Sequence, residues 1–212
     1  MFRSLVLVAT AALVFSACDS NDPEVDPVDL SVQTATNVAA DPTTGRNPTT
    51  GAPISSGRYA LYSLRTNSLV LGSNEADRSD STSGAWDIGF RGTNIIANGS
   101  GSGPGLGGVQ VLETTFADVV TAPLDGYLGI LAQTTTPNWY TYTGSGTNLI
   151  LPTAGRTILV RTADGAGYAK VQVRSYYQNA PATPVAGTDV SRYFTFDFVL
   201  NPSGTTFVET QD

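Results

Sequence analysis

Apolar and polar residues alternate most regularly in two segments of the chain, residues 86–91 and residues 192–200. The apolar positions are Trp86, Ile88 and Phe90 in the first segment and Phe194, Phe196, Phe198 and Leu200 in the second. A period of two predicts a strand with one buried face, because successive side chains of a strand point to opposite sides. We therefore expect both segments to be core strands whose apolar rows meet in one core, with Asp87 and Asp197 on the opposite faces.

Shorter strand patterns surround these two segments. Residues 59–64 and 69–71 flank a turn-like stretch, and residues 157–162 and 168–177 flank an Asp-Gly turn, so each pair predicts a hairpin. Residues 205–209 predict a last strand. No sustained helical spacing of apolar residues occurs after Gly57, although residues 116–120 could form one short helical turn. The sequence therefore predicts an all-β protein with a single β-rich domain over residues 58–212.

A glycine-rich stretch lies between the two alternating segments. Gly103, Gly105 and Gly108 match the spacing of a dinucleotide-binding loop, but that loop requires a following helix. Residues 109–112 read Val-Gln-Val-Leu, which is typical of a strand. No Gly-Lys-Ser or Gly-Lys-Thr occurs, so a Walker phosphate loop is excluded. We expect a loop between two strands.

The first 17 residues have the layout of a secretory signal. An apolar run over residues 5–15 follows Arg3 and precedes small residues, and it is too short to span a bilayer. Residues 14–18, Val-Phe-Ser-Ala-Cys, resemble a bacterial lipobox, which predicts a lipoprotein signal peptide over residues 1–17 and a lipid anchor on Cys18. An ordinary signal peptide is the alternative. Residues 18–57 are acidic at the start and rich in proline and threonine, so we expect an extended tether.

The composition of the chain excludes several classes of function. The chain has 11 basic and 18 acidic residues, a net charge of -7, which argues against a nucleic-acid partner. It has no histidine, one cysteine and one methionine, Met1. A Ser-His-Asp triad, a Cys-His pair and the usual zinc sites therefore cannot form. A glycoside hydrolase with two carboxylates is the enzyme class that remains. We expect a binding module rather than an enzyme, with no metal site.

Aromatic residues supply the candidate site. Trp139, Tyr140 and Tyr142 lie beside a Gly-Ser-Gly turn and combine large apolar bodies with polar groups, a combination that suits a ligand-binding edge. The alternative is a hairpin with one face in the core.

The order of several short motifs resembles the HmuY-like haem-binding lipoproteins. The motifs follow the lipobox and acidic tether at residues 59–64, 86–90, 98–108, 122–127, 160–172 and 194–198. The resemblance implies an all-β fold and lipid attachment to the outer membrane of a Gram-negative bacterium, on the cell surface. It also implies capture of haem or a related tetrapyrrole for delivery to an outer-membrane transporter.

The resemblance also indicates two regions for the axial ligands of the haem iron, residues 128–136 and 139–146. Family members place histidine or methionine there, and this chain has neither. Tyr140 and Tyr142 are the residues of the second region that could ligate iron. We therefore expect a haem-binding surface lipoprotein without the family's ligands. A structural lipoprotein, or one that binds a glycan or another ligand, is the alternative.

Overall fold

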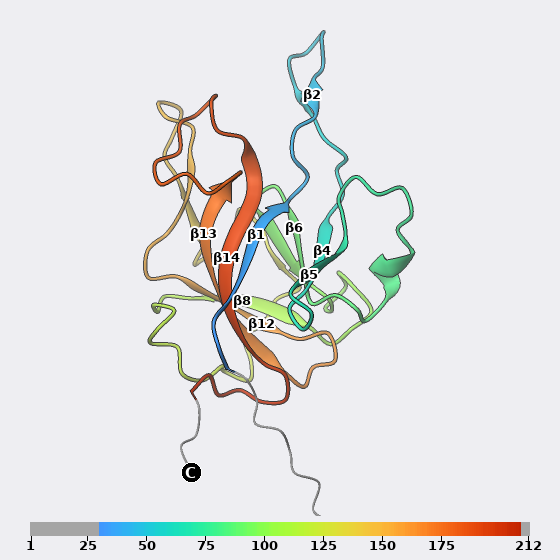
Figure 1. Cartoon of the computed structure of the whole chain (residues 1–212), viewed down its shortest axis with the longest axis vertical. Helices are drawn as coiled ribbons and strands as arrows, with labels where there is room; N and C mark the ends of the chain where they lie inside the picture. Colours follow the sequence, from blue (N-terminus) through green and yellow to red (C-terminus); the bar gives the residue numbers. More distant parts are fainter. Residues whose placement is uncertain (1–29, 209–212) are drawn as a thin grey trace, which may run out of the picture.

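The protein is an all-β sandwich, as the sequence predicts. The computed structural model describes residues 30–208, in which two five-stranded antiparallel sheets pack face to face (Figure 1). Within these residues, no helix has the length and hydrophobicity needed to cross a membrane. The predicted signal peptide and Cys18 lie outside the described residues.

Every strand pair in the two sheets is antiparallel. The first sheet has the order β1 (Gln33–Ala39), β14 (Ser191–Asn201), β13 (Tyr168–Tyr177), β12 (Thr157–Arg161) and β8 (Gly108–Leu112). The second has the order β5 (Ser68–Leu71), β4 (Ala60–Ser63), β6 (Ile88–Arg91), β7 (Asn94–Ala97) and β9 (Ile130–Leu131). Two small hairpins, β2 (Gly45–Arg46) with β3 (Pro53–Ile54) and β10 (Tyr140–Tyr142) with β11 (Ile150–Pro152), and a 3-10 turn η1 (Ser79–Thr82) complete the fold.

The two alternating segments form the centre of the core. The ring of Phe90 on β6 lies 4.6 Å from that of Phe194 and 5.4 Å from that of Phe196, both on β14. All three side chains are fully buried. The predicted meeting of the two apolar rows is thus confirmed for Ile88 and Phe90.

The prediction that Trp86 shares this core is wrong. Strand β6 begins at Ile88, so the chain before it does not continue the strand register. Trp86 instead packs in a separate cluster on the other face of the second sheet, with Leu61, Leu71 and Ile96. Asp87 is only 2% exposed, although the alternation places it on the outer face.

The predicted hairpins are present as β4–β5 and β12–β13, and the glycine-rich stretch is the connection from β7 to β8. Two smaller predictions are wrong. Residues 116–118 form a turn without a helix, and residues 205–208 hold only an isolated bridge, between Thr206 and Thr121. Glu209 lies outside the described residues.

The prediction of a tether over residues 18–57 is wrong for its described part. Strand β1 pairs along β14 at the edge of the first sheet, and Ala35, Val38 and Ala40 are buried. The prolines of this region flank β1 without interrupting it, so the seven residues of the strand keep their backbone donors. The β-domain therefore begins by Gln33, and residues 18–29 lie outside the described part.

Both described ends of the chain lie at the same end of the sandwich. Gln33 pairs with Phe198 and Ala39 with Tyr193, so β1 runs from the end of β14 toward its start. Leu30 and Phe207 pack in one cluster. The β2–β3 hairpin projects from the opposite end (Figure 1).

Candidate ligand-binding cavity

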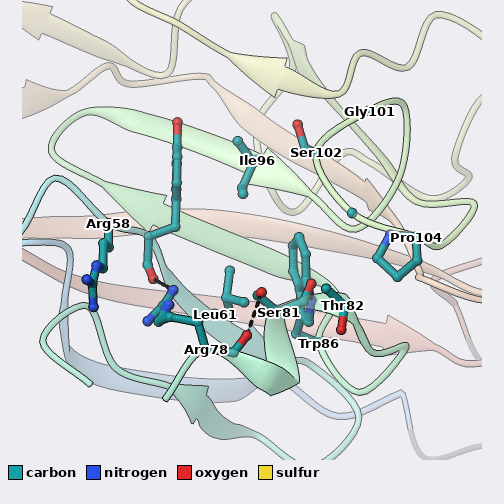
Figure 2. Close-up of a pocket in the computed structure, with 12 residues that line it drawn as sticks. Arg58, Leu61, Arg78, Ser81, Thr82, Trp86, Ile96, Gly101, Ser102 and Pro104 are labelled. Carbon is teal, nitrogen blue, oxygen red and sulfur yellow. Dashed lines mark hydrogen bonds between the residues drawn. The ribbon is translucent and has the colours of Figure 1, made fainter. Parts of the chain in front are cut away.

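A cavity of about 520 Å³ lies on the outer face of the second sheet, and we call it the outer cavity. Two loops form its walls, residues 72–85 between β5 and β6 and the glycine loop, residues 99–107, between β7 and β8. Apolar surface predominates in the lining. It consists of Arg58, Tyr59, Leu61, Arg78, Ser81, Thr82, Trp86, Ile96, Gly101, Ser102, Gly103 and Pro104 (Figure 2).

The floor of the outer cavity depends on a glycine in β6. A Cβ built on Gly89 would lie 2.8 Å from Leu61 Cδ2 and 2.9 Å from Ile96 Cγ1. Such contacts are too short for any side chain, so only glycine lets Leu61 and Ile96 close over β6 from the neighbouring strands. Leu61 and Ile96 thus form an apolar floor, and Figure 2 shows these two side chains between Arg78 and Ser102.

Trp86 joins the two walls. Its indole Nε1–H donates to the Ser81 carbonyl at 3.2 Å, and Gly103 lies against the ring at Cζ2. A Cβ on Gly103 would lie 2.6 Å from Trp86 Cζ2, so the glycine loop rests directly on the indole. Asn98 supports both walls, since its Nδ2 donates to Ser83 O at 2.9 Å and its Oδ1 accepts from Gly105 N at 3.0 Å.

Two arginines lie at the rim of the outer cavity. Arg78 Nη1 donates to Gly72 O at 2.5 Å and its Nη2 to Tyr59 O at 2.6 Å, which fixes the guanidinium. Arg58 Nη1 donates to Glu75 O at 3.0 Å. Burial and the neighbouring positive charge of Arg58 lower the pKa of Arg78, and they outweigh the Glu75 carboxylate, which acts to raise it. Within residues 30–208, neither arginine forms a salt bridge, and the Glu75 carboxylate offsets their two positive charges only in part.

The three aromatic residues singled out by the sequence do not line the outer cavity. Trp139 is 2% exposed and packs on Phe194 with ring centroids 5.2 Å apart, and its Nε1–H donates to Thr93 O at 3.1 Å. It borders a small cavity of about 180 Å³. Tyr140 is partly buried beside Trp139, and the exposed Tyr142 donates its hydroxyl hydrogen to Asn148 Oδ1 at 2.5 Å. The alternative that the sequence offered, a hairpin with one face in the core, agrees with these positions, since β10 pairs with β11 and Trp139 lies in the core.

Both candidate ligands of a haem iron, Tyr140 and Tyr142, lie apart from the outer cavity, and their ligand role stays a prediction. The Tyr142 hydroxyl is engaged on the surface, and Tyr140 lies against Trp139 at a ring distance of 4.8 Å. Neither phenol lines the outer cavity. Across the described part of the chain, no group of three or more histidine, cysteine, aspartate or glutamate side chains could hold a metal ion.

Sequence reasoning missed the outer cavity. Its floor and walls come from parts of the chain that are far apart in the sequence. They are one apolar residue on β4, one on β7, the tryptophan before β6, and two loops. One signal was available, because glycine-dense sequence often marks a close approach of backbone to a neighbouring group. Gly103 against Trp86 is such an approach.

No protein-family model matches this chain, and no curated protein matches it. The resemblance to HmuY-like lipoproteins therefore stays a prediction.

Proposed function

We propose that the protein is a surface-displayed binding module that holds an amphipathic, acidic ligand in the outer cavity. The observation that carries the proposal is the combination of an apolar floor with two fixed arginines at the rim. The volume of about 520 Å³ falls within the usual range of small-molecule sites. Among the described residues, those that line the cavity include no carboxylate, so they offer contacts and hydrogen bonds rather than an acid-base pair.

The arrangement of charge supports an anionic group on the ligand. The protein carries a net charge of -7, yet Arg58 and Arg78 stand close together without a salt bridge among the described residues, and one nearby carboxylate, that of Glu75, faces two guanidinium groups. A carboxylate placed between two guanidinium groups reduces their mutual repulsion and accepts charge-assisted hydrogen bonds. The apolar part of the same ligand would lie on Leu61 and Ile96, where each buried Å² contributes about 25 cal/mol.

A tetrapyrrole is the ligand class that we propose, because the resemblance to HmuY-like proteins implies haem and because the porphyrin combines a broad apolar ring with two carboxylates. The proposed mode of binding differs from that family. Packing and the rim arginines would hold the ring, and no protein ligand to the iron is involved. Lipid attachment through Cys18 at the outer membrane and transfer to a transporter complete the proposed role in haem acquisition.

Titration of the full chain, purified in detergent, tests this function. Ferric haem and iron-free protoporphyrin are added separately while tryptophan fluorescence and the thermal midpoint are followed. We expect saturable binding of both with similar affinity, and a stabilisation of about 2.7 kcal/mol at 100 times the Kd. Arg58→Gln should weaken binding by about tenfold or more, because a charge-assisted hydrogen bond is lost. Arg46→Gln, whose arginine donates only to Gly51 O on the distant β2–β3 hairpin, is the matched control.

The possible outcomes separate the alternatives. A low-spin six-coordinate haem spectrum that disappears in Tyr140→Phe plus Tyr142→Phe would contradict binding by packing and restore the tyrosine ligands. Binding of oleate but of neither porphyrin would keep the amphipathic class and exclude tetrapyrroles. No saturable binding of any of the three would favour a structural lipoprotein or a different ligand class.

A further inference from the structure

A second cavity, of about 430 Å³, lies at the end of the sandwich opposite the described chain ends, and we call it the end cavity. Asp41 follows β1 and Arg192 begins β14, so the cavity lies where these two strands meet the β6–β7 turn. Its lining consists of Asp41, Ser55, Gly57, Arg91, Gly92, Thr93, Asn94, Gln133, Tyr176 and Arg192. Polar surface predominates in it, in contrast to the outer cavity.

Two arginines face the end cavity with unused donors. Arg91 Nη1 donates to Gly57 O at 3.1 Å, and Arg192 Nη1 donates to Asp41 O at 2.9 Å. The Tyr176 hydroxyl is a further partner of Arg192. A guanidinium has several N–H groups in a planar fork, so each arginine retains donors beyond these contacts. Both acceptors of Nη1 are neutral carbonyls, and the Arg91 guanidinium also lies 4.6 Å from the centroid of the Tyr59 ring, so none of these contacts supplies a full negative charge.

The carboxylate in the lining does not neutralise them. Asp41 Oδ1 accepts from Ser56 N and from Ser56 Oγ, both at 2.7 Å, and its Oδ2 accepts from Gly57 N at 3.0 Å. Burial acts to raise the pKa of Asp41, but these hydrogen bonds outweigh it and the pKa lies below its usual value. Within residues 30–208, neither Arg91 nor Arg192 forms a salt bridge, whereas three other arginines do, Arg65 with Asp164, Arg156 with Glu113 and Arg174 with Asp197.

Backbone conformations with positive φ also gather at the end cavity, and those of Asp41 and Arg192 belong to residues with a Cβ. Four of its lining residues have positive φ, Asp41 at 58°, Gly57 at 72°, Gly92 at 54° and Arg192 at 68°. Residues with a Cβ rarely adopt this conformation, and such strain persists where the surrounding structure imposes it, often at a binding site. Here hydrogen bonds from Ala40 N to Arg192 O and from Gly92 N to Ala40 O hold the three segments together. The fold thus fixes Arg192 at the cavity in a conformation that an arginine does not prefer.

From this combination we propose that the end cavity binds a small acidic sugar, with its carboxylate on Arg91 and Arg192. The planar forks of two arginines match the two oxygens of a carboxylate. The amides of Asn94 and Gln133 and the hydroxyl of Thr93 both donate and accept, as the hydroxyls of a sugar require. The Ser55 hydroxyl donates to Asp41 and remains an acceptor. A volume of about 430 Å³ suits a small organic molecule, and the polar lining disfavours a lipid. This site is separate from the outer cavity and does not depend on the function proposed for it.

Saturation-transfer difference NMR on the full chain in detergent tests the proposal. The probes are D-glucuronate, D-galacturonate and N-acetylneuraminate, with D-glucose, D-galactose and acetate as the neutral and non-sugar controls. We expect at least one acidic sugar to bind at least about tenfold more tightly than its neutral counterpart and than acetate. Arg192→Gln and Arg91→Gln should each weaken that binding by about tenfold or more, while Arg46→Gln should leave it unchanged.

Three results would overturn the proposal. The first is the absence of a transfer signal from every acidic sugar at about 10 mM, because a Kd above roughly that concentration is too weak for a specific site. The second is equal binding of acetate, which would indicate a simple anion site. The third is undiminished binding of the acidic sugar by Arg91→Gln. This variant tests the proposal by itself if Arg192→Gln does not fold. Porphyrin binding measured on Arg192→Gln tells the two cavities apart, because Arg192 does not line the outer cavity. Arg91→Gln serves less well for this comparison, since the Arg91 guanidinium lies 4.6 Å from the ring centroid of Tyr59, which lines the outer cavity.

Discussion

Asp87 Oδ1 accepts a hydrogen bond from the backbone N–H of Ala163 at 3.1 Å, across 76 positions of sequence. Asp87 Oδ2 accepts another from Leu64 N at 3.0 Å. One carboxylate therefore connects the start of β6 in the second sheet, the end of β4 beside it, and the turn between β12 and β13 in the first sheet. The contact explains why an acidic side chain is buried between two sheets.

Replacement of Asp87 by asparagine should destabilise the fold. The amide keeps the shape of the carboxyl group but offers one acceptor oxygen, so the N–H of either Ala163 or Leu64 loses its partner. A buried unsatisfied donor costs roughly 1–3 kcal/mol, and we expect a loss of that order in denaturant unfolding at pH 7. Asp125→Asn is the control, since Asp125 is exposed and only its backbone carbonyl is engaged. Equal losses in both variants would show that the two hydrogen bonds contribute nothing.

The cost of Asp87→Asn should also depend on pH. Burial raises the pKa of Asp87 above its ordinary value of 3.8, against the opposing hydrogen bonds from Ala163 and Leu64. A raised folded-state pKa means that the folded protein binds the proton more tightly than the unfolded chain does. The stabilisation is complete below the unfolded pKa and is lost as pH rises through the folded one. The difference in unfolding free energy between wild type and Asp87→Asn should therefore be larger near pH 4 than at pH 7, and a difference that grows with pH would contradict the shift.

The sequence could predict the strands whose alternation is long and regular. Phe194, Phe196 and Phe198 follow the period of two along an eleven-residue strand, and all are buried. Trp86 could not be placed in this way, because β6 is four residues long and begins after it. Trp86 and Asp87 continue the alternation in the sequence by coincidence, without belonging to the strand. Strand β1 was hidden by the prolines on either side. The outer cavity could not be predicted because contacts such as Gly89 with Leu61 and Ile96 depend on the register between strands.

Strand β1 should prove essential to the domain. Ala35 is 3% exposed and pairs with Phe196, so Ala35→Asp would bury a charge with no partner. Such a charge is among the most destabilising changes known, and we expect a loss of at least about 3 kcal/mol or failure to fold. Thr36→Asp, at the next and exposed position, should change stability by less than about 0.5 kcal/mol. Thermal unfolding of both variants measures this, and equal midpoints would mean that residues 30–39 are a tether after all.

Cys18 should carry the membrane anchor. Metabolic labelling with a palmitate analogue is expected to mark the wild type and not Cys18→Ser, and the serine variant should leave the membrane fraction. An acyl chain contributes roughly 0.8 kcal/mol per buried methylene, so loss of the chains should release the protein entirely. Equal labelling of the two proteins would exclude this anchor.

Gly103→Ala should separate the integrity of the outer cavity from that of the core. The added methyl would lie 2.6 Å from Trp86 Cζ2 and 2.3 Å from Asn98 Oδ1, so the glycine loop must move away from the indole. Overpacking of this kind costs about 1–3 kcal/mol. Gly84→Ala is the matched control in the facing wall, because a Cβ there meets nothing within 4 Å and its φ is not positive. We expect Gly103→Ala to lower the unfolding free energy and to weaken porphyrin binding about tenfold or more, with Gly84→Ala unchanged in both. A Gly103→Ala variant that loses stability but binds porphyrin as the wild type does would show that the glycine loop is not a wall of the binding site.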